Sequence, residues 1–109
     1  LVLSLAWGQF GVSPAEGADL PNGQKVYEAK CLRCHGKEGR GDGPKAAELD
    51  KQPRDFTNQA HMLKHGDADL KKAVIEGKPP MPAFKGKLKD KDIEDVIAYI
   101  KIFAARAGK

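Results

Sequence analysis

The sequence predicts an all-α domain of three or more helices joined by long loops. Two segments, Asp67–Glu76 and residues 90–105, carry apolar residues at helical spacing after an acidic first turn. A third helix is expected to begin at Pro21 or Asn22. No stretch alternates apolar and polar residues as a half-buried strand does, and no internal repeat is present. At 109 residues, the chain has the length of one domain.

The first predicted helix leads toward the first of only two cysteines. Val26 and Tyr27 are followed by Lys30 and Cys31 at helical spacing, after a proline suited to a helix start. We therefore expect this helix to deliver the cysteines to the loop that follows.

Two segments between the helices are rich in glycine and proline. Residues 36–53 contain four glycines and two prolines, which exclude a long regular element but leave room for a short turn at residues 45–49. Residues 78–87 contain Pro79, Pro80 and Pro82, which lack backbone donors and hold the chain extended. Loops of this length are uncommon in a small domain and are usually functional, so we expect them to line a cofactor.

The composition also favours a buried cofactor. Aromatic residues make up 6% of the chain and charged residues 31%. A domain of this size hides roughly two-thirds of its unfolded surface, which leaves a modest core. A large, flat apolar group among the side chains would add buried surface.

The chemistry is carried by Cys31-Leu32-Arg33-Cys34-His35, a C-x-x-C-H pattern. In this pattern two thiols add to the vinyl groups of a haem, and the adjacent imidazole coordinates the iron. One turn of chain places both sulfurs at one edge of the macrocycle and leaves His35 beneath the metal. We therefore expect one covalent haem c.

Three other uses of the cysteine pair stay open at this point. A zinc site would need His61 and His65 in addition to the two cysteines, and no finger or ribbon pattern surrounds them. A thiol redox pair would be expected in a βαβ context, which is absent. A structural disulfide would leave His35 and the proline-rich segment unexplained.

Met81 is the candidate for the sixth iron ligand. It lies in Pro79-Pro80-Met81-Pro82-Ala83-Phe84, where prolines hold the chain stiff, so little conformational freedom is lost when the thioether binds. The competing candidates, Met62, His61 and His65, lie in a polar segment without such a frame.

The Cys31 to His35 motif and the Met81 segment are accompanied by other motifs of one protein family. These are, in chain order, Gly23 with Tyr27, Gly41-Asp42-Gly43-Pro44, Arg54-Asp55-Phe56-Thr57 and Val96-Ile97-Ala98-Tyr99-Ile100. With these features, residues 20–105 resemble a class I c-type cytochrome of the short, single-haem bacterial group. The resemblance implies the cytochrome c fold, in which helices and long loops wrap around one covalent haem.

The resemblance also implies roles for individual residues. Gly23 would let the first helix cross closely over the last, with Tyr27 and Tyr99 packed at the crossing. A backbone carbonyl near Pro44 would accept the ring proton of His35. Arg54 would neutralise a haem propionate, although a solvated loop arginine is an equally ordinary role for it.

The start of the last helix departs from the pattern of this family. Lys89 stands where relatives usually have a Ser or Thr cap, and Asp90 is expected to serve instead.

The distribution of charge along the chain indicates which kinds of partner the protein could bind. The net charge is +4, and the basic residues are spread from Lys25 to Lys109 without a block of like charges. Aromatic residues are not interleaved with them, which argues against nucleic-acid binding. The lysines are either an ordinary solvated surface or a ring around the cofactor edge that steers docking onto acidic redox partners.

The N-terminal segment has the features of an export signal. Residues 1–10 are apolar and uncharged, and small residues follow, so that a cut after Ala15 or after Gly17 places small residues where the peptidase reads them. We expect residues 1–17 to be a truncated signal peptide and residues 18–109 to form the cytochrome c domain. The protein is then periplasmic or otherwise exported, a monomer, and without a membrane span in its mature part. Retention of the segment as an anchor is the alternative.

The sequence thus predicts a single-electron carrier with His35 and Met81 as axial ligands, in a respiratory or photosynthetic chain, and not an enzyme. Thioether ligation raises the reduction potential, which suits a carrier. A fixed haem subunit of a larger oxidoreductase is the main alternative. A haem enzyme or sensor with an open iron site is a weaker one, because no distal His or Arg is identifiable.

Overall fold

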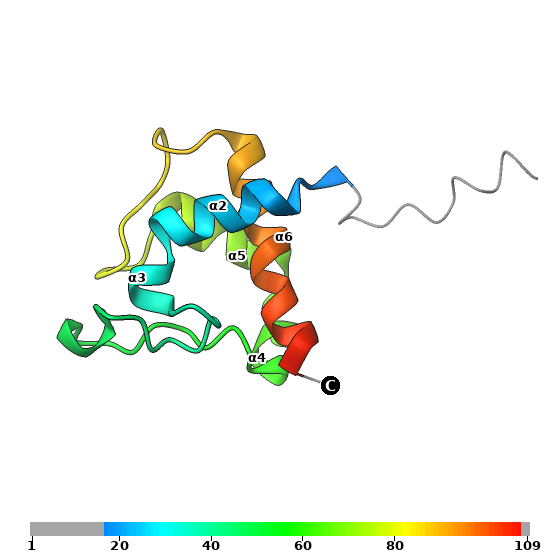
Figure 1. Ribbon diagram of the computed structural model, residues 1–109. Helices are drawn as coiled ribbons and strands as arrows, with labels where there is room; N and C mark the ends of the chain where they lie inside the picture. The colour runs from blue at the N-terminus through cyan, green and yellow to red at the C-terminus, as the bar shows by residue number, and fades with distance from the viewer. Residues whose placement is uncertain (1–16, 108–109) are drawn as a thin grey trace, which may run out of the picture.

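The computed structural model describes residues 17–107 and is helical throughout its regular parts (Figure 1). The elements are, in chain order, α2 (Leu20–Lys30), α3 (Leu32–His35), the 3-10 turn η2 (Ala46–Glu48), α4 (Gln59–Lys64), α5 (Asp67–Glu76) and α6 (Asp90–Ala107). Within residues 17–107 no strand forms, and two isolated bridges join Lys78 with Met81 and Lys85 with Leu88. The all-α prediction is confirmed. The expected signal segment lies outside the described residues, except for Gly17.

Helix α2 begins slightly before the predicted position. Asp19 caps it, and its side chain accepts a hydrogen bond of 3.0 Å from the amide of Asn22. Pro21 lies in the first turn, where the amide that it lacks would have no helical partner.

Helix α2 crosses α6 at close range (Figure 1). Gly23 makes this possible, because a Cβ at this position would overlap the carbonyl oxygen of Asp95 on α6. Tyr27 is fully buried at the crossing, with its ring centroid 5.5 Å from that of Tyr99 and 5.2 Å from that of Phe103. The roles predicted for Gly23, Tyr27 and Tyr99 are confirmed.

The core is one apolar cluster built mainly from the inner faces of α2, α5 and α6. Its buried members are Val26, Tyr27, Phe56, Leu70, Val74, Phe84, Ile93, Val96, Ile97, Ile100 and Phe103. Phe56 and Phe84 come from the loops, so the two glycine- and proline-rich segments are tied to the helical core.

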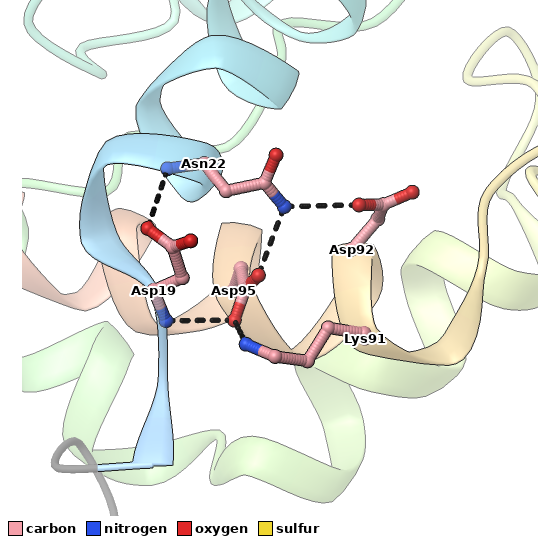
Figure 2. Close-up of polar contacts among 5 residues, drawn as sticks. All are labelled: Asp19, Asn22, Lys91, Asp92 and Asp95. Atoms are coloured by element: carbon pink, nitrogen blue, oxygen red, sulfur yellow. Dashed lines mark hydrogen bonds and ion pairs between the residues drawn. The ribbon is translucent and has the colours of Figure 1, made fainter.

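A polar network pins the start of the domain to α6 (Figure 2). Asp95 is fully buried, and its carboxylate accepts hydrogen bonds from the Asp19 amide at 2.9 Å, from Asn22 Nδ2 at 2.9 Å and from Lys91 Nζ at 2.6 Å. Asn22 Nδ2 also donates to Asp92 at 2.9 Å. Since every bond of the buried carboxylate is made to a residue of α2, its cap or α6, the network fixes the crossing.

Helix α5 has the predicted bounds and ends where expected. Gly77 stops it with a left-handed φ of 71°. Residues 78–87, which we call the strap, then run back along α5, where Phe84 N–H donates to the Val74 carbonyl at 2.9 Å and Lys85 N–H donates to the Ile75 carbonyl at 3.2 Å. The strap is therefore anchored at its far end. The expectation that it is extended throughout was wrong, because a turn at Pro79 and Pro80 pairs the Met81 amide with the Lys78 carbonyl and a second turn follows at residues 86–87.

The sequence did not reveal α4, which lies beside the end of α6 (Figure 1). Asn58 caps α4, with its side-chain oxygen accepting from the His61 amide at 3.0 Å. Gln59 Nε2 donates to the Ala104 carbonyl of α6 at 2.8 Å.

The start of α6 differs from the expectation that Asp90 serves as its cap. Asp92, not Asp90, completes the first turn, because its carboxylate lies 3.4 Å from the amide of Lys89. This is the reciprocal half of a capping box, and Lys89 itself occupies the cap position.

No helix among residues 17–107 combines the length and the apolar character needed to cross a membrane.

Candidate haem-binding site

The C-x-x-C-H motif forms a short helical corner after α2. Cys31 caps the end of α2, and its carbonyl accepts from the amides of Cys34 at 3.2 Å and His35 at 3.0 Å. Both cysteines are free and half-buried. Burial, followed by the nearby Cys34, raises the pKa of the Cys31 thiol to about 12. The motif thus presents two free thiols on one turn, followed at once by an imidazole.

The corner is tied back to the α2–α6 crossing. The hydroxyl of Tyr27 donates to the carbonyl of Gly36 at 2.6 Å. Burial raises the pKa of this hydroxyl, which therefore stays protonated as a donor. Gly36 has a φ of 90°, a conformation that favours glycine. The position directly after His35 is therefore fixed by the core.

The ring of His35 is held on two sides. Its Nδ1 lies 3.2 Å from the carbonyl oxygen of Arg54, and its ring stacks on Phe56 with centroids 4.4 Å apart. Burial lowers the pKa of His35, against the opposing effect of the bond to the Arg54 carbonyl. The imidazole is therefore neutral at neutral pH. Donation from Nδ1 to the carbonyl leaves the lone pair on Nε2, the form that binds a metal.

The acceptor for the His35 ring is not the one predicted. We expected a carbonyl near Pro44, but Pro44 is exposed, and the amides that flank it donate to the Cys34 and Arg33 carbonyls at 3.0 and 2.8 Å. The amide of Phe56 donates to the Gly39 carbonyl at 2.6 Å. This bond holds the segment that follows Pro53 next to His35. The expectation that a carbonyl near Pro44 accepts this proton was therefore wrong for this structure.

Met81 lies at the centre of the strap. It is half-buried, packs against the same apolar cluster as Cys31, and its amide donates to the Lys78 carbonyl at 2.6 Å. Gly77 sets the start of the strap, because a Cβ there would approach the carbonyl oxygen of Met81 to 2.8 Å and the amide of Ala83 to 2.7 Å.

The competing ligand candidates lie on and next to α4. Met62 is also half-buried against the core. His61 and His65 face each other with ring centroids 4.5 Å apart, and His65 Nδ1 lies 3.4 Å from a carboxylate oxygen of Asp69. The two histidines are thus engaged with each other and with α5. Within residues 17–107 no group of three or more His, Cys, Asp or Glu side chains is arranged to hold a metal ion.

Arg54 contributes to a cavity of about 260 Å³ beside the strap. Two lysines, Lys72 and Lys78, and one histidine, His65, also border this cavity. The carboxylates that border it are Asp69 and Glu76. Positive charge therefore predominates around the opening.

Sequence reasoning gave no role to Phe56, although it is a member of the site. The ring stacks on His35 and lies 6.4 Å from Phe103, so it links the histidine to α6. The chain has only four phenylalanines, and an aromatic residue within a loop of glycines and prolines was the available signal.

This donor set fits a covalently attached haem. Two free thiols one turn apart, a neutral imidazole with a defined tautomer and a thioether on a tethered strap are the groups that such a haem requires. A zinc site is not supported, because His61 on α4 and His65 directly after it pair with each other, and no cluster with the cysteines forms within residues 17–107.

Comparison with known proteins identifies the family. The family described as "Cytochrome C oxidase, cbb3-type, subunit III" matches residues 18–100. Cytochrome c6 of Nostoc sp. is 36% identical over 101 residues, which cover 92% of this chain and 86% of that protein. The chain belongs to the class I c-type cytochromes. It is a small haem c electron carrier and not an enzyme.

Other relatives agree with this placement. Cytochrome c6 of Pyropia tenera is 40% identical, over 76% of this chain and 91% of that one. The structure of cytochrome c6 from the diatom Phaeodactylum tricornutum superposes with a TM-score of 0.58 at 27% identity, over 83% of this chain and 99% of that one. The predicted cytochrome c fold is therefore confirmed. A chain of the reducing HAO-like protein complex of Kuenenia stuttgartiensis gives a TM-score of 0.69 at 32% identity, over 84% of this cytochrome and 46% of that chain.

Proposed function

We propose that this cytochrome is an exported, diffusible carrier of single electrons in a respiratory or photosynthetic chain, with His35 and Met81 as its axial ligands. The observation that carries the proposal is the double support of His35, by the Arg54 carbonyl at 3.2 Å and the Phe56 ring at 4.4 Å, together with a strap whose Met81 packs against the same apolar cluster as Cys31. The haem, once attached, supplies an iron that alternates between ferric and ferrous states.

The residues of the chain would then act by orientation and exclusion. Cys31 and Cys34 would hold the macrocycle through thioether bonds, and the Arg54 carbonyl would keep the Nδ1 proton and make Nε2 the donor to the metal. Phe56 and the core would exclude water from the buried side. Since both axial positions would be filled, no substrate would reach the iron.

Replacement of Met81 by Ala tests the axial ligand. We expect a lower reduction potential, because the thioether favours the reduced state, together with loss of the weak near-infrared band of ferric Met ligation and rapid carbon monoxide binding by the reduced protein. Met62→Ala is the matched control, since Met62 is the only other methionine and is also half-buried against the core. If Met62→Ala removes the band and Met81→Ala does not, the assignment is wrong.

We assign Arg54 two roles in the proposed site. Its carbonyl would orient His35, while its guanidinium, on the cationic cavity beside the strap, would neutralise a propionate. Arg54→Gln keeps the carbonyl and removes the charge, so we expect a changed reduction potential with the His/Met spectrum intact. Pro44 keeps a smaller proposed role, which is to stiffen the turn after the haem motif.

The surface charge supports docking onto acidic redox partners. Lys78, Lys85, Lys87 and Lys89 are all exposed along and just after the strap. A monomer with such a surface would bind its partners briefly, as small and weak electron-transfer contacts allow.

A fixed haem subunit of a larger oxidoreductase is the second candidate. It is favoured by the similarity to a chain of the HAO-like complex and by the family description. Gel filtration of native extract distinguishes the two candidates, because a free carrier elutes as a single small domain and a subunit elutes with its complex.

A further inference from the structure

We propose that Phe56 is a positioning residue for His35, and that it sets the plane of the imidazole ring with Phe103 stacked behind it. The inference rests on the proposed function, because it takes His35 as the iron ligand. The polar contact alone leaves the ring free to turn, since the bond from Nδ1 to the Arg54 carbonyl at 3.2 Å holds one ring atom. Rotation about the last side-chain bond of histidine is broad, so a second contact is needed to define the plane.

Stacked rings supply this second contact. The planes of His35 and Phe56 are inclined by 16°, with centroids 4.4 Å apart. The planes of Phe56 and Phe103 are inclined by 10°, with centroids 6.4 Å apart. Three nearly parallel rings, which we call the aromatic column, therefore run from α6 to the histidine. An imidazole that turned out of this plane would lose its stacked contact with Phe56.

The base of the aromatic column is held by the crossing of α2 and α6. Phe103 is buried, and its ring centroid lies 5.2 Å from that of Tyr27 and 5.4 Å from that of Tyr99. These two rings meet it at interplanar angles of 54° and 80°, so they pack against it in directions different from that of the stack. Since a close-packed core resists rotation of its side chains, the crossing fixes Phe103, and Phe103 limits the movement of Phe56.

Gly39 joins the aromatic column to the loop after the haem motif. Its carbonyl accepts a hydrogen bond from the Phe56 amide at 2.6 Å, which fixes the backbone of Phe56. A Cβ at Gly39 would lie 2.7 Å from a ring carbon of Phe103, so the glycine also makes room for that ring. Phe56 is itself buried, and its ring therefore has little space into which it could turn away from His35.

Solvent exchange of the His35 ring proton tests the inference. It is measured by nuclear magnetic resonance on the reduced, haem-bearing protein with isotope-labelled histidines, of which the chain has only three. Phe56→Leu removes the ring but keeps an apolar side chain, and Phe56→Tyr restores an aromatic plane. Phe84→Leu is the matched control, because Phe84 is also a buried phenylalanine from a loop but belongs to the strap and not to the aromatic column.

We expect Phe56→Leu to speed the exchange of this proton at least about tenfold, because the imidazole can then turn away from the carbonyl without losing a stacked partner. The oxidised Phe56→Leu protein should also give two low-spin signals in electron paramagnetic resonance where the parent gives one, since two orientations of the imidazole become populated. Phe56→Tyr should restore slow exchange and the single signal. Phe84→Leu should leave the exchange slow.

Slow exchange and a single signal in Phe56→Leu would overturn the inference. Equal acceleration in Phe84→Leu would also overturn it, because general loosening of the core would then explain the result. Failure of the proposed function is seen separately and earlier. A parent protein without the low-spin spectrum of two axial ligands would contradict the proposed ligation, and this inference with it, before any substitution is made.

Discussion

Gly23 decides, by the absence of one methyl group, how closely two helices approach. The carbonyl of Asp95 occupies the space in which a Cβ would lie. Gly23→Ala should therefore force α2 and α6 apart and lower the free energy of unfolding by about 1–3 kcal/mol, as overpacking of a core does. Chemical denaturation followed by circular dichroism measures this loss.

Gly66 provides the control for this prediction. It has a φ of −77° and open space around an added Cβ. Gly66→Ala should cost no more than about 1 kcal/mol, the usual effect of Ala at a helix cap. Equal losses for the two variants would show that the crossing does not depend on the close approach.

Asp95 gives the fold a dependence on acid. Burial alone would raise the pKa of Asp95, but the hydrogen bonds from Lys91, the Asp19 amide and Asn22 outweigh it, and the pKa is lowered. A carboxyl group with a lowered folded pKa stabilises the protein fully above its ordinary value of about 4, and this contribution disappears as the pH falls through the folded pKa.

Replacement of Asp95 by Asn should accordingly flatten the stability curve below pH about 4. At pH 7 it should lower the melting temperature by roughly 5–10 °C, because the network loses its charged acceptor. Thermal melts at several pH values give both quantities. Glu94→Gln, one residue earlier and exposed, should change neither, and a change of the same size there would contradict the role of Asp95.

Residue identity indicates some members of the proposed haem site and not others. Cys31, Cys34, His35 and Met81, the proposed attachment and ligand residues, carry side chains whose chemistry suits those roles. The partner of the His35 ring is a main-chain carbonyl, which every residue possesses, so the sequence did not distinguish Arg54 from the neighbourhood of Pro44. The buried Asp95 resembles an ordinary polar position of an amphipathic helix, and its bond to Asp19 spans 76 residues.

At the scale of elements, the strap depends on the way α5 ends. Gly77 has a φ of 71°, and an added Cβ would approach the backbone of Met81 and Ala83. Gly77→Ala should therefore displace the strap and weaken the proposed Met81 ligation. We expect a fall in the near-infrared band and faster carbon monoxide binding, both measured on purified haem-bearing protein.

Gly86 is the matched control, because its φ of 79° is equally unfavourable for Ala but an added Cβ meets no atom within 4 Å. Gly86→Ala should cost stability alone and leave the iron spectrum unchanged. If both variants lose the band, backbone strain, not the position of the strap, explains the result.

Whether a helix could be predicted depended on its length and on the residues that mark its start and its end. Helices α5 and α6 have an acidic start and a clear apolar face, and Gly77 ends the first of them, so local sequence was sufficient. Helix α4 has six residues and too few apolar positions to show a period, and it is held by Asn58 and by a bond to α6. Contacts of that kind are visible only in three dimensions.

At the scale of the whole molecule, the net charge of +4 should govern association with an acidic partner. We expect the second-order rate of electron transfer to an anionic protein to fall roughly tenfold between about 10 and 200 mM salt, because screening shortens the range of attraction. Stopped-flow kinetics measures the rate.

Reversal of charge on the strap should have a similar effect at low salt. Lys85→Glu combined with Lys87→Glu should slow the reaction, whereas Arg106→Glu, in the last turn of α6, should slow it much less. Equal effects would mean that total charge, not a docking face, controls the rate.

The two bonds between the strap and α5 imply an order of local opening. The amides of Phe84 and Lys85 are paired with Val74 and Ile75, and Phe84 is buried, whereas Pro79, Pro80 and Pro82 have no amide hydrogen. The first half of the strap can thus fluctuate without breaking these bonds, while release of its second half must loosen α5 as well. In hydrogen-exchange measurements the Phe84 amide should therefore exchange with the slow amides of α5, and the Met81 amide should exchange earlier.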